Sequence, residues 1–301
     1  MKRLVHWVGF AVVVFAATQA SGEDLNGTLK KIKDGGAITL GHRESSIPFS
    51  YYDDNQQVIG YAMDLCHRIV DAIKIELGLP TLEVKLNPVT SATRIPLLAN
   101  GTIDLECGST TNNAERQKQV TYTITHFVTA NRFVSKKSAN LKSVDDLKGK
   151  TIVSTSGTTN IKQITEINAQ KNLGMNILTA KDHAEGLLMV ETDRAAAFVM
   201  DDILLYSLVA TSKSPGDYVI SADALSVEPY GIMLRRDDPA FKKVVDSTMI
   251  AIYKSGEINQ IYHKWFLEPI PPKGVNLNVP MSTSFGKVVA HPTDSPDPAA
   301  Y

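Results

Sequence analysis

Segments typical of β-strands and of α-helices alternate along most of this chain, and this alternation restricts its fold more than any other feature. Short apolar runs at residues 37–40, 82–86 and 151–154 are each followed by a polar loop and then by a segment with helical spacing. Within residues 61–73 an apolar side chain recurs at every fourth position, and the pattern ends before Gly78. Such alternation predicts an α/β protein built from open, mostly parallel sheets with helices on both faces.

The chain is also long enough for two lobes. A chain of 301 residues is longer than a typical domain with one hydrophobic core, and its length suits two domains of about 100–200 residues each. Further along the chain, residues 183–191 are predicted to form a helix, residues 230–235 are predicted to form one strand, and another helix is expected to begin after Asp238. Beyond residue 270 no periodicity is present, so residues 271–301 are predicted to form an arm or tail.

The N-terminus is typical of a secretory signal peptide. Lys2 and Arg3 precede an apolar stretch at residues 4–17, which is followed by small and polar residues. A membrane anchor is the less favoured interpretation, because about 20 apolar residues are needed to span a bilayer. We expect residues 1–20 to be removed by cleavage after Ala20, and the mature protein to be exported, soluble and periplasmic.

Composition and short motifs argue against several functional classes. With 31 basic and 32 acidic side chains, the chain lacks the basic surplus that a nucleic-acid-binding surface requires. The motifs of zinc proteases, redox dithiols, dinucleotide-binding loops and P-loops are missing, and the seven histidines show no metal-ligand spacing, so we expect neither a metal nor a cofactor. Two cysteines, Cys66 and Cys107, remain after cleavage. The sequence does not decide whether they form a disulfide or stay as two buried thiols.

Polar residues of particular kinds follow the predicted strands, where ligands bind in open α/β sheets. Hydroxyl groups and arginines, which suit carboxylates, occur in or beside several of these loops, and Asp201, which suits an ammonium group, occurs in another. The loops are residues 41–46, 90–94, 108–111 with Arg116, 155–159 and 200–202. Taken singly, each residue is explained as a helix cap or a solvated charge. Only their joint placement favours a site for a zwitterion.

Longer runs of sequence resemble a known family. Segments in the same order along the chain are similar to the polar amino-acid family (family 3) of periplasmic solute-binding proteins; they are residues 60–65, 94–104, 113–118, 147–150, 156–159 and 264–266. Other runs resemble the glutamate/aspartate-binding subgroup that serves ABC transporters; they are residues 41–46, 106–113, 180–183, 200–202 and 269–272. The chain departs from the family pattern at Ala62, where many members have aspartate.

This resemblance implies a two-lobed periplasmic binding protein fold (type II), in which two open mixed sheets with flanking helices are joined by two crossover strands. Lobe one would comprise residues 24–131 and 229–270, and lobe two residues 132–228. The resemblance also implies an exported monomeric receptor without catalytic activity. It would bind L-glutamate or L-aspartate in the cleft between the lobes and deliver it to the permease subunits of an ABC importer.

The same resemblance assigns roles to individual residues at the ligand's backbone groups. Arg116, Thr111 and Ser109 would hold the α-carboxylate. Asp201 would hold the α-ammonium group, and Tyr230 would lie near the cleft at the second crossover.

A second set of residues would surround the side-chain carboxylate of the ligand: Arg43, Ser91, Arg94 and His183, with Thr159 contributing from lobe two. The charges agree with this assignment, because three arginines and one histidine against one aspartate leave a surplus of about two positive charges. A second carboxylate would offset that surplus. Arginines buried without a partner would cost several kcal/mol, so a neutral amino acid should be rejected.

Two alternative functions remain open at this stage. A small exported enzyme on the same fold, similar to a cyclohexadienyl dehydratase, could use His183 with Asp182 or Asp201 as an acid–base pair, although no activated nucleophile is evident. A binding protein for a plain dicarboxylate such as succinate would use the arginines but leave Asp201 without an ammonium partner. The sequence also does not rank glutamate above aspartate, because the two differ by a single methylene.

Overall fold

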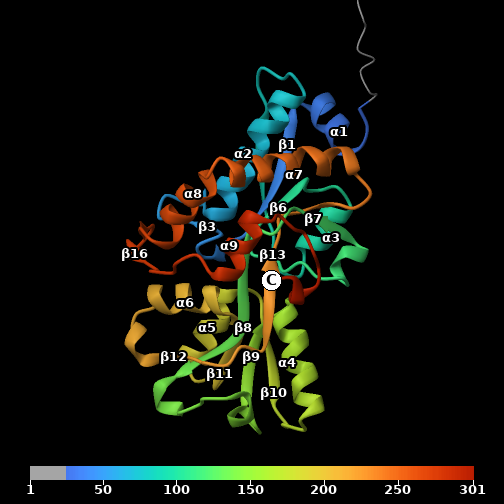
Figure 1. The fold of residues 1–301 in the computed structure, drawn as a ribbon. Helices are drawn as coiled ribbons and strands as arrows, with labels where there is room; N and C mark the ends of the chain where they lie inside the picture. The colour runs from blue at the N-terminus through green and yellow to red at the C-terminus, as the bar shows by residue number, and fades with distance from the viewer. Residues whose placement is uncertain (1–24) are drawn as a thin grey trace, which may run out of the picture.

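The structure, a computed structural model, describes residues 25–301 as two α/β lobes, one above the other in Figure 1. The predicted signal peptide, residues 1–20, lies outside the described residues. Lobe one contains a 5-stranded sheet in the order β5 (Glu83–Pro88), β1 (Ala37–His42), β6 (Leu105–Cys107), β14 (Met233–Arg235) and β7 (Val120–Tyr122). Lobe two contains a 6-stranded sheet in the order β10 (Asn176–Ala180), β9 (Thr151–Thr155), β11 (Ala197–Asp201), β8 (Phe127–Lys136) and β12 (Tyr218–Ile220), with β13 (Ser226–Tyr230) also paired to β8.

Helices flank both sheets, so the predicted α/β architecture with mixed sheets is confirmed. Those of lobe one are α1 (Gly27–Gly35), α2 (Tyr61–Glu76), α3 (Arg94–Ala99), α7 (Pro239–Lys254) and α8 (Glu257–Phe266). Those of lobe two are α4 (Thr159–Gln170), α5 (His183–Glu191) and α6 (Asp202–Thr211). A small antiparallel sheet of β2 (Ser45–Ser46), β3 (Ser50–Tyr52) and β4 (Val58–Ile59) precedes α2.

Helix α2 shows how the sequence pattern becomes packing in lobe one. The apolar side chains spaced four residues apart, among them Leu65 and Ile69, are fully buried against the sheet. On the same helix, Cys66 is bonded to Cys107 of β6, with Cα atoms 6.2 Å apart. The alternative that the sequence left open is thereby decided in favour of a disulfide, which joins helix and sheet in lobe one.

Strands β8 and β13 form the connection between the lobes. They pair with each other in antiparallel orientation from Asn131 and Ser226 to Phe127 and Tyr230, and both run from one lobe to the other in Figure 1. The prediction of a single strand at residues 230–235 is wrong, because the chain changes sheet there. Tyr230 ends β13, whereas Met233 begins β14 between β6 and β7 of lobe one. Both halves are buried, so the apolar pattern shows no interruption.

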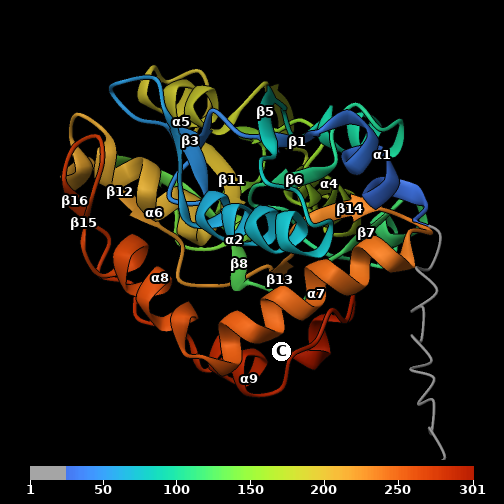
Figure 2. The same cartoon turned by 90° about the horizontal axis from the view of Figure 1, so that it is seen from above.

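The C-terminal segment, residues 271–301, was predicted to be an arm or tail, and it contains regular structure. A hairpin of β15 (Pro269–Ile270) and β16 (Val275–Asn276) is followed by helix α9 (Thr283–Ala290), which lies beside α7 in Figure 2. Phe285 of α9 is buried and its ring packs edge-on against that of Tyr253. Helix α9 is short and has only two buried side chains, which explains why its periodicity is weak in the sequence. No helix within residues 25–301 is both long enough and apolar enough to cross a membrane.

Candidate functional site

Polar side chains from both lobes meet at the boundary between the two sheets. They follow the carboxyl ends of strands β5 and β6 in lobe one and of β9, β10 and β11 in lobe two, which is where open α/β sheets place ligands. The cavity between them is lined by Ser91, Arg94, Ser109, Thr111, Thr158, Thr159, Asn160, His183, Met200, Asp201 and Leu204. Seven of the ten residues expected from the sequence therefore line one cavity: Ser91, Arg94, Ser109, Thr111, Thr159, His183 and Asp201. The other three are outside this lining, but each contacts one of its residues: Arg43 contacts His183, Arg116 contacts Thr111, and Tyr230 contacts Asp201.

Arg43 approaches the site from the end of β1 and contacts His183 of lobe two. Its Nη2 lies 3.4 Å from His183 Nε2, and His183 Nδ1 lies 3.0 Å from the hydroxyl of Thr155. Burial, and then the charges of Arg43 and Arg94, lower the pKa of His183 well below its usual value. The imidazole is therefore neutral: Nε2 accepts from Arg43 and Nδ1 donates to Thr155. The surplus of about two positive charges therefore comes from the three arginines against Asp201, because burial beside two arginines opposes protonation of His183.

Arg94 is the first residue of α3, and its side chain is buried beside a carboxylate. Its Nη1 donates to the Ser109 carbonyl at 3.3 Å and to the Thr110 hydroxyl, and lies 3.7 Å from Glu106 Oε1. Burial lowers the pKa of Arg94 to about 9, while Glu106 opposes this shift, so the side chain is charged at neutral pH. Sequence reasoning missed Glu106. Its signal was an acidic residue inside an otherwise apolar strand, between Leu105 and Cys107.

Arg116 lies at the start of a short 3₁₀-helix and connects the two lobes. Its Nη1 donates to the Thr111 carbonyl at 2.8 Å, and its Nη2 donates to the Gly157 carbonyl at 3.2 Å across the lobe boundary. Thr111 itself is held by a backbone bridge to Tyr230 at the end of β13. The guanidinium group is thus adjacent to the hydroxyl-bearing loop that was expected to bind a carboxylate.

Asp201 ends β11 and presents a carboxylate to the cavity from lobe two. Its Oδ1 accepts from Asn160 Nδ2 at 2.7 Å, and its Oδ2 accepts from the Tyr230 hydroxyl. Burial, followed by the nearby charge of Glu228, raises the pKa of Asp201 to about 7. A cation beside this carboxylate would favour its ionised form. Asn160 was not expected from the sequence; it lies one residue beyond the loop that was singled out.

The hydroxyl of Thr159 is engaged by another buried carboxylate. It donates to Glu228 Oε2 at 3.0 Å, and Glu228 Oε1 accepts from Gln163 at 2.7 Å and from the hydroxyl of Ser226. Thr159 therefore lines the cavity while its side chain is tied to strand β13.

Several buried donors of lobe one have no protein partner. Within the described part of the chain, Arg43 Nη1, Arg94 Nε and the hydroxyls of Ser91 and Ser109 are inaccessible and make no hydrogen bond. Buried polar atoms are normally paired, and an unpaired donor on a charged group is especially costly. The donors in this half of the site suit an anion, and two guanidinium groups suit more than one carboxylate oxygen.

The two lobes touch directly across the cavity. The contacts include the Arg43–His183 and Arg116–Gly157 hydrogen bonds described above, and an ion pair between Lys162 of α4 and Glu115. Gly157 lies so close to lobe one that a Cβ atom there would be 2.6 Å from Ala92 Cα. The structure is therefore a closed arrangement of the lobes.

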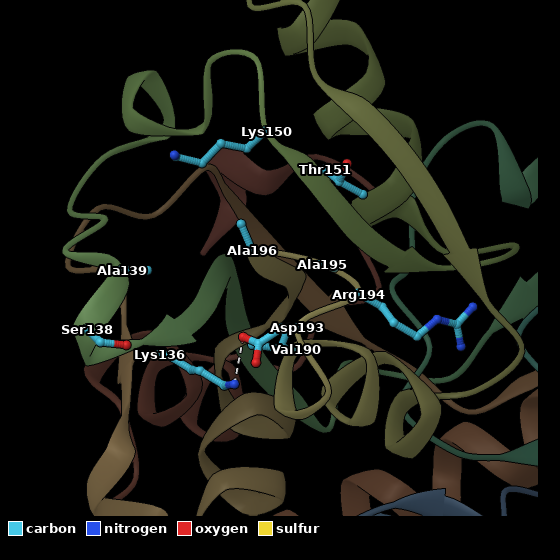
Figure 3. Close-up of a pocket in the computed structure, with 10 residues that line it drawn as sticks. All are labelled: Lys136, Ser138, Ala139, Lys150, Thr151, Val190, Asp193, Arg194, Ala195 and Ala196. Atoms are coloured by element: carbon cyan, nitrogen blue, oxygen red, sulfur yellow. Dashed lines mark hydrogen bonds and ion pairs between the residues drawn. The ribbon is translucent and has the colours of Figure 1, made fainter.

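A second hollow, drawn in Figure 3, lies on lobe two and has a different character. Its charged lining residues are Lys136, Lys150, Asp193 and Arg194, and these four are half-buried or exposed. Lys136 is paired with Asp193 at 2.7 Å. No buried donors or acceptors converge on it, so the cavity between the lobes is the stronger candidate. No cluster of three or more metal-ligating side chains occurs among residues 25–301.

Comparisons with known proteins find solute-binding proteins by sequence. The family model described as bacterial extracellular solute-binding proteins, family 3, matches residues 38–268. The L-glutamate/L-aspartate-binding protein of Pseudomonas aeruginosa is 54% identical over 284 residues, which is 94% of this chain and 94% of that protein. The glutamate/aspartate import solute-binding protein of Escherichia coli is 47% identical over 267 residues, covering 89% of this chain and 88% of the other.

Solved structures share the fold. A mutant of ArgBP from T. maritima matches with a TM-score of 0.71 and 28% identity, over 80% of this chain and 99% of that one. An ancestral amino acid-binding protein, described as a precursor of cyclohexadienyl dehydratase, matches with a TM-score of 0.66 and 28% identity, over 79% and 99% of the two chains.

Proposed function

This chain belongs to the bacterial extracellular solute-binding proteins, family 3, and we propose that it is the receptor of an ABC importer for L-glutamate and L-aspartate. The observation that carries the proposal is the division of the site by charge. Lobe one contributes Arg43 and Arg94 with unpartnered buried donors, and lobe two contributes the carboxylate of Asp201. A ligand with two carboxylates and one ammonium group complements both halves.

The proposed assignment of contacts follows this division. The side-chain carboxylate of the ligand would bind Arg94 and Ser91 and contact the neutral His183, with Arg43 behind them. The α-carboxylate would bind the loop that carries Ser109 and Thr111, supported by Arg116. The α-ammonium group would bind Asp201 and keep it ionised, and Thr159 would complete the wall on the side of lobe two. Tyr230 would act indirectly, by holding Asp201.

Opening and closing would occur about the paired strands that connect the lobes. We propose that lobe one comprises residues 24–131 and 229–270 and lobe two residues 132–228, so that the chain crosses between lobes within β8 and β13. The two strands are hydrogen-bonded to each other along the crossing, which favours a hinge motion over a sliding one. Closure would bring Arg116 onto Gly157, and the permease subunits would recognise the closed, liganded monomer.

An enzymatic function on the same fold is less well supported. The two relatives that are 54% and 47% identical to this chain are described as binding proteins. Of the proteins compared above, only the ancestral structure, which is 28% identical, is linked to a dehydratase. In this chain both ring nitrogens of His183 and both carboxylate oxygens of Asp201 already make hydrogen bonds to protein groups. The imidazole of His183 therefore has no free nitrogen from which to transfer a proton to a substrate, whereas the remaining lone pairs of Asp201 are those assigned to the ammonium group of the ligand. We propose that the chain is not an enzyme.

The export of the protein is a separate part of the proposal. The N-terminal pattern of Lys2, Arg3 and the apolar residues 4–17 supports secretion to the periplasm with cleavage after Ala20. The intact mass of the protein recovered from the periplasm tests this directly. A mass equal to that of the full 301 residues would contradict cleavage.

The ligand is tested by thermal unfolding of the mature protein with L-glutamate, L-aspartate, L-glutamine, L-asparagine or succinate. The protein is first stripped of any bound ligand by unfolding and refolding. At about 1,000 times Kd a ligand adds roughly 4 kcal/mol to the free energy of unfolding, which raises Tm by several degrees in a chain of this size. We expect shifts with L-glutamate and L-aspartate only.

Two other outcomes would contradict the proposal in different ways. Equal shifts with the amides would show that Arg43 and Arg94 do not select for a second carboxylate. No shift with any of the five ligands would remove the evidence for an amino-acid site, and would return attention to the enzymatic alternative. Catalysis is tested by incubating the protein with L-glutamate for a prolonged time and measuring how much L-glutamate remains. We expect the amount of L-glutamate to stay unchanged.

A further inference from the structure

Glu106 is a buried carboxylate that the proposed ligand contacts leave without a role. It lies in β6, the central strand of the lobe-one sheet, between Gly41 of β1 and Met233 of β14 in the strand register. Its side chain is fully buried. A carboxylate in the middle of a sheet requires compensation, because charge is costly to remove from water.

The neighbours of Glu106 are the groups that form the anion-binding half of the site. Its Oε2 accepts from the Thr110 hydroxyl at 2.6 Å, and Thr110 in turn accepts from Arg94. Its Oε1 lies 3.7 Å from Arg94 Nη1 and makes no hydrogen bond within the described residues. Glu106 also has the largest effect of any acidic group on Arg43, whose pKa is lowered by burial and partly restored by this carboxylate.

The chain makes room for Glu106 at Gly108. A Cβ atom at this position would lie 2.4 Å from Glu106 Oε1 and 3.0 Å from Arg43 Cγ, although the backbone of Gly108 does not have the positive φ that favours glycine. Position 108 therefore requires glycine, because any side chain there would collide with Glu106. The glycine lets the carboxylate lie directly beneath the loop that presents Ser109 and Thr111 to the cavity.

We propose that Glu106 is a specificity-determining residue, which reduces the positive charge of the site so that it prefers an amino dicarboxylate to a plain dicarboxylate. This inference rests on the proposed function and deepens it. Three arginines close to two ligand carboxylates would bind any dicarboxylic acid. The negative charge of Glu106 weakens that attraction for both carboxylates and adds to the attraction of Asp201 for an ammonium group. Its effect on selectivity comes through charge rather than through contact with the ligand.

Glutarate and L-glutamate form the matched pair of ligands that tests this inference, because they differ only by the ammonium group. In Glu106→Gln the charge is removed and the shape is kept. We expect the ratio of Kd for glutarate to Kd for L-glutamate to fall about tenfold, because the variant loses the attraction between Glu106 and the ammonium group. An unchanged ratio would overturn the inference.

Thr110→Val is the matched control, because it removes the hydroxyl between Arg94 and Glu106 but leaves both charges in place. We expect it to weaken binding of both ligands by a similar factor, so that the ratio stays at the wild-type value. A fall in the ratio equal to that of Glu106→Gln would show that Glu106 only positions Arg94, which would also overturn the charge mechanism.

The experiment separates this inference from the proposed function. If the wild-type protein binds neither L-glutamate nor L-aspartate, the proposed function fails and this inference fails with it. If the wild type binds them and the ratio does not change in Glu106→Gln, only the role of Glu106 is rejected. If Glu106→Gln does not fold without a ligand, both proteins can be refolded with excess glutarate or with excess L-glutamate. The yield of folded protein with glutarate, divided by the yield with L-glutamate, should then be higher for the variant than for the wild type.

Discussion

The two lobes contribute opposite halves of one site. Lobe one provides guanidinium groups, hydroxyls and Glu106, and among the described residues Arg43 Nη1, Arg94 Nε and the hydroxyls of Ser91 and Ser109 are buried at the site without a protein partner. Lobe two provides Asp201, whose oxygens are both hydrogen-bonded by Asn160 and Tyr230. The anion-binding half is therefore left with unused hydrogen-bonding capacity, whereas the cation-binding half is already held in place.

The lobes also differ in how they are stabilised. Lobe one carries the Cys66–Cys107 disulfide, and the C-terminal helix α9 packs against α7 of the same lobe. In the described chain all cysteines are used by that bridge, so lobe two has no disulfide. Because buried arginines repel one another, the lobe that concentrates them is the one that benefits from additional covalent and packing support.

The largest expected effect tests the anion-binding half. Arg94→Ala should weaken L-glutamate binding about 1,000-fold, because it removes a buried charged donor and leaves Glu106 unpaired. Isothermal titration calorimetry measures the loss, and circular dichroism checks the fold. Arg236→Ala, at an exposed arginine of the same lobe, is the control and should bind normally. Unchanged affinity in Arg94→Ala would mean that Arg94 does not face the ligand.

The second prediction concerns the unequal support of the lobes. Cys66 and Cys107 are separated by 41 positions, so replacing both with serine should lower the free energy of unfolding by about 4 kcal/mol. Denaturant titration measures this change, and hydrogen exchange should locate it in α2 and β6. An equal loss of protection from hydrogen exchange throughout lobe two would contradict the conclusion that the disulfide stabilises lobe one. Reduction of the wild type should reproduce the effect.

The cation-binding half is tested by pH. Asp201, with its pKa raised to about 7, must lose a proton before it binds an ammonium group, so Kd for L-glutamate should rise about tenfold for each pH unit below 7. The folding stability of the ligand-free protein should change with pH in the opposite direction to the affinity. Its folded state keeps a proton that the unfolded state releases near pH 4, so its stability should fall as the pH rises from about 4 to 7.

Asp201→Asn checks that assignment, because it cannot titrate. Both pH dependences should become nearly flat in this variant, and L-glutamate should bind more weakly than to the wild type at pH 8. Calorimetry and thermal unfolding between pH 5 and 8 give the two profiles. A pH dependence that persists in Asp201→Asn would assign the proton to another group.

The smallest effect tests the contact between the lobes. Gly157 has φ +77°, and a Cβ atom there would collide with the backbone of Ala92, so Gly157→Ala should oppose closure and weaken binding about tenfold. Gly149→Ala is the control: its φ is +69° and nothing lies within 4 Å of a Cβ atom, so it carries similar backbone strain without the collision. We expect the two variants to lose similar stability, about 1 kcal/mol, but only Gly157→Ala to lose affinity. Equal affinities would show that closure tolerates the extra atom.

Much of the fold could be predicted because its signals are local. The helix at residues 183–191 has the predicted bounds, and its first turn is capped by Asp182, which accepts from the Glu185 amide. Ser143 and Asp146, which are three residues apart, form a capping box by a similarly local interaction. Alternation of strands and helices placed the polar loops at one edge of each sheet, which was enough to nominate residues for a site.

Other features depended on partners that are distant in the chain. The change of sheet at Gly231 has no signal in an apolar pattern that is buried on both sides. The neutral state of His183 depends on Arg43 and Arg94, which come from the other lobe. Glu106 was missed because a single acidic residue in a strand gives no indication of the guanidinium group beside it.

Local periodicity and loop chemistry in the amino-acid sequence therefore determined the α/β class, the order of the elements and the kinds of group that a ligand would meet. Only the tertiary structure decided which of those groups face one cavity, which of them are charged, and that Cys66 and Cys107 are joined. The reason is physical. Helix and strand patterns are set by neighbours a few residues apart, whereas burial and electrostatic environment are set by side chains that only the folded chain brings together.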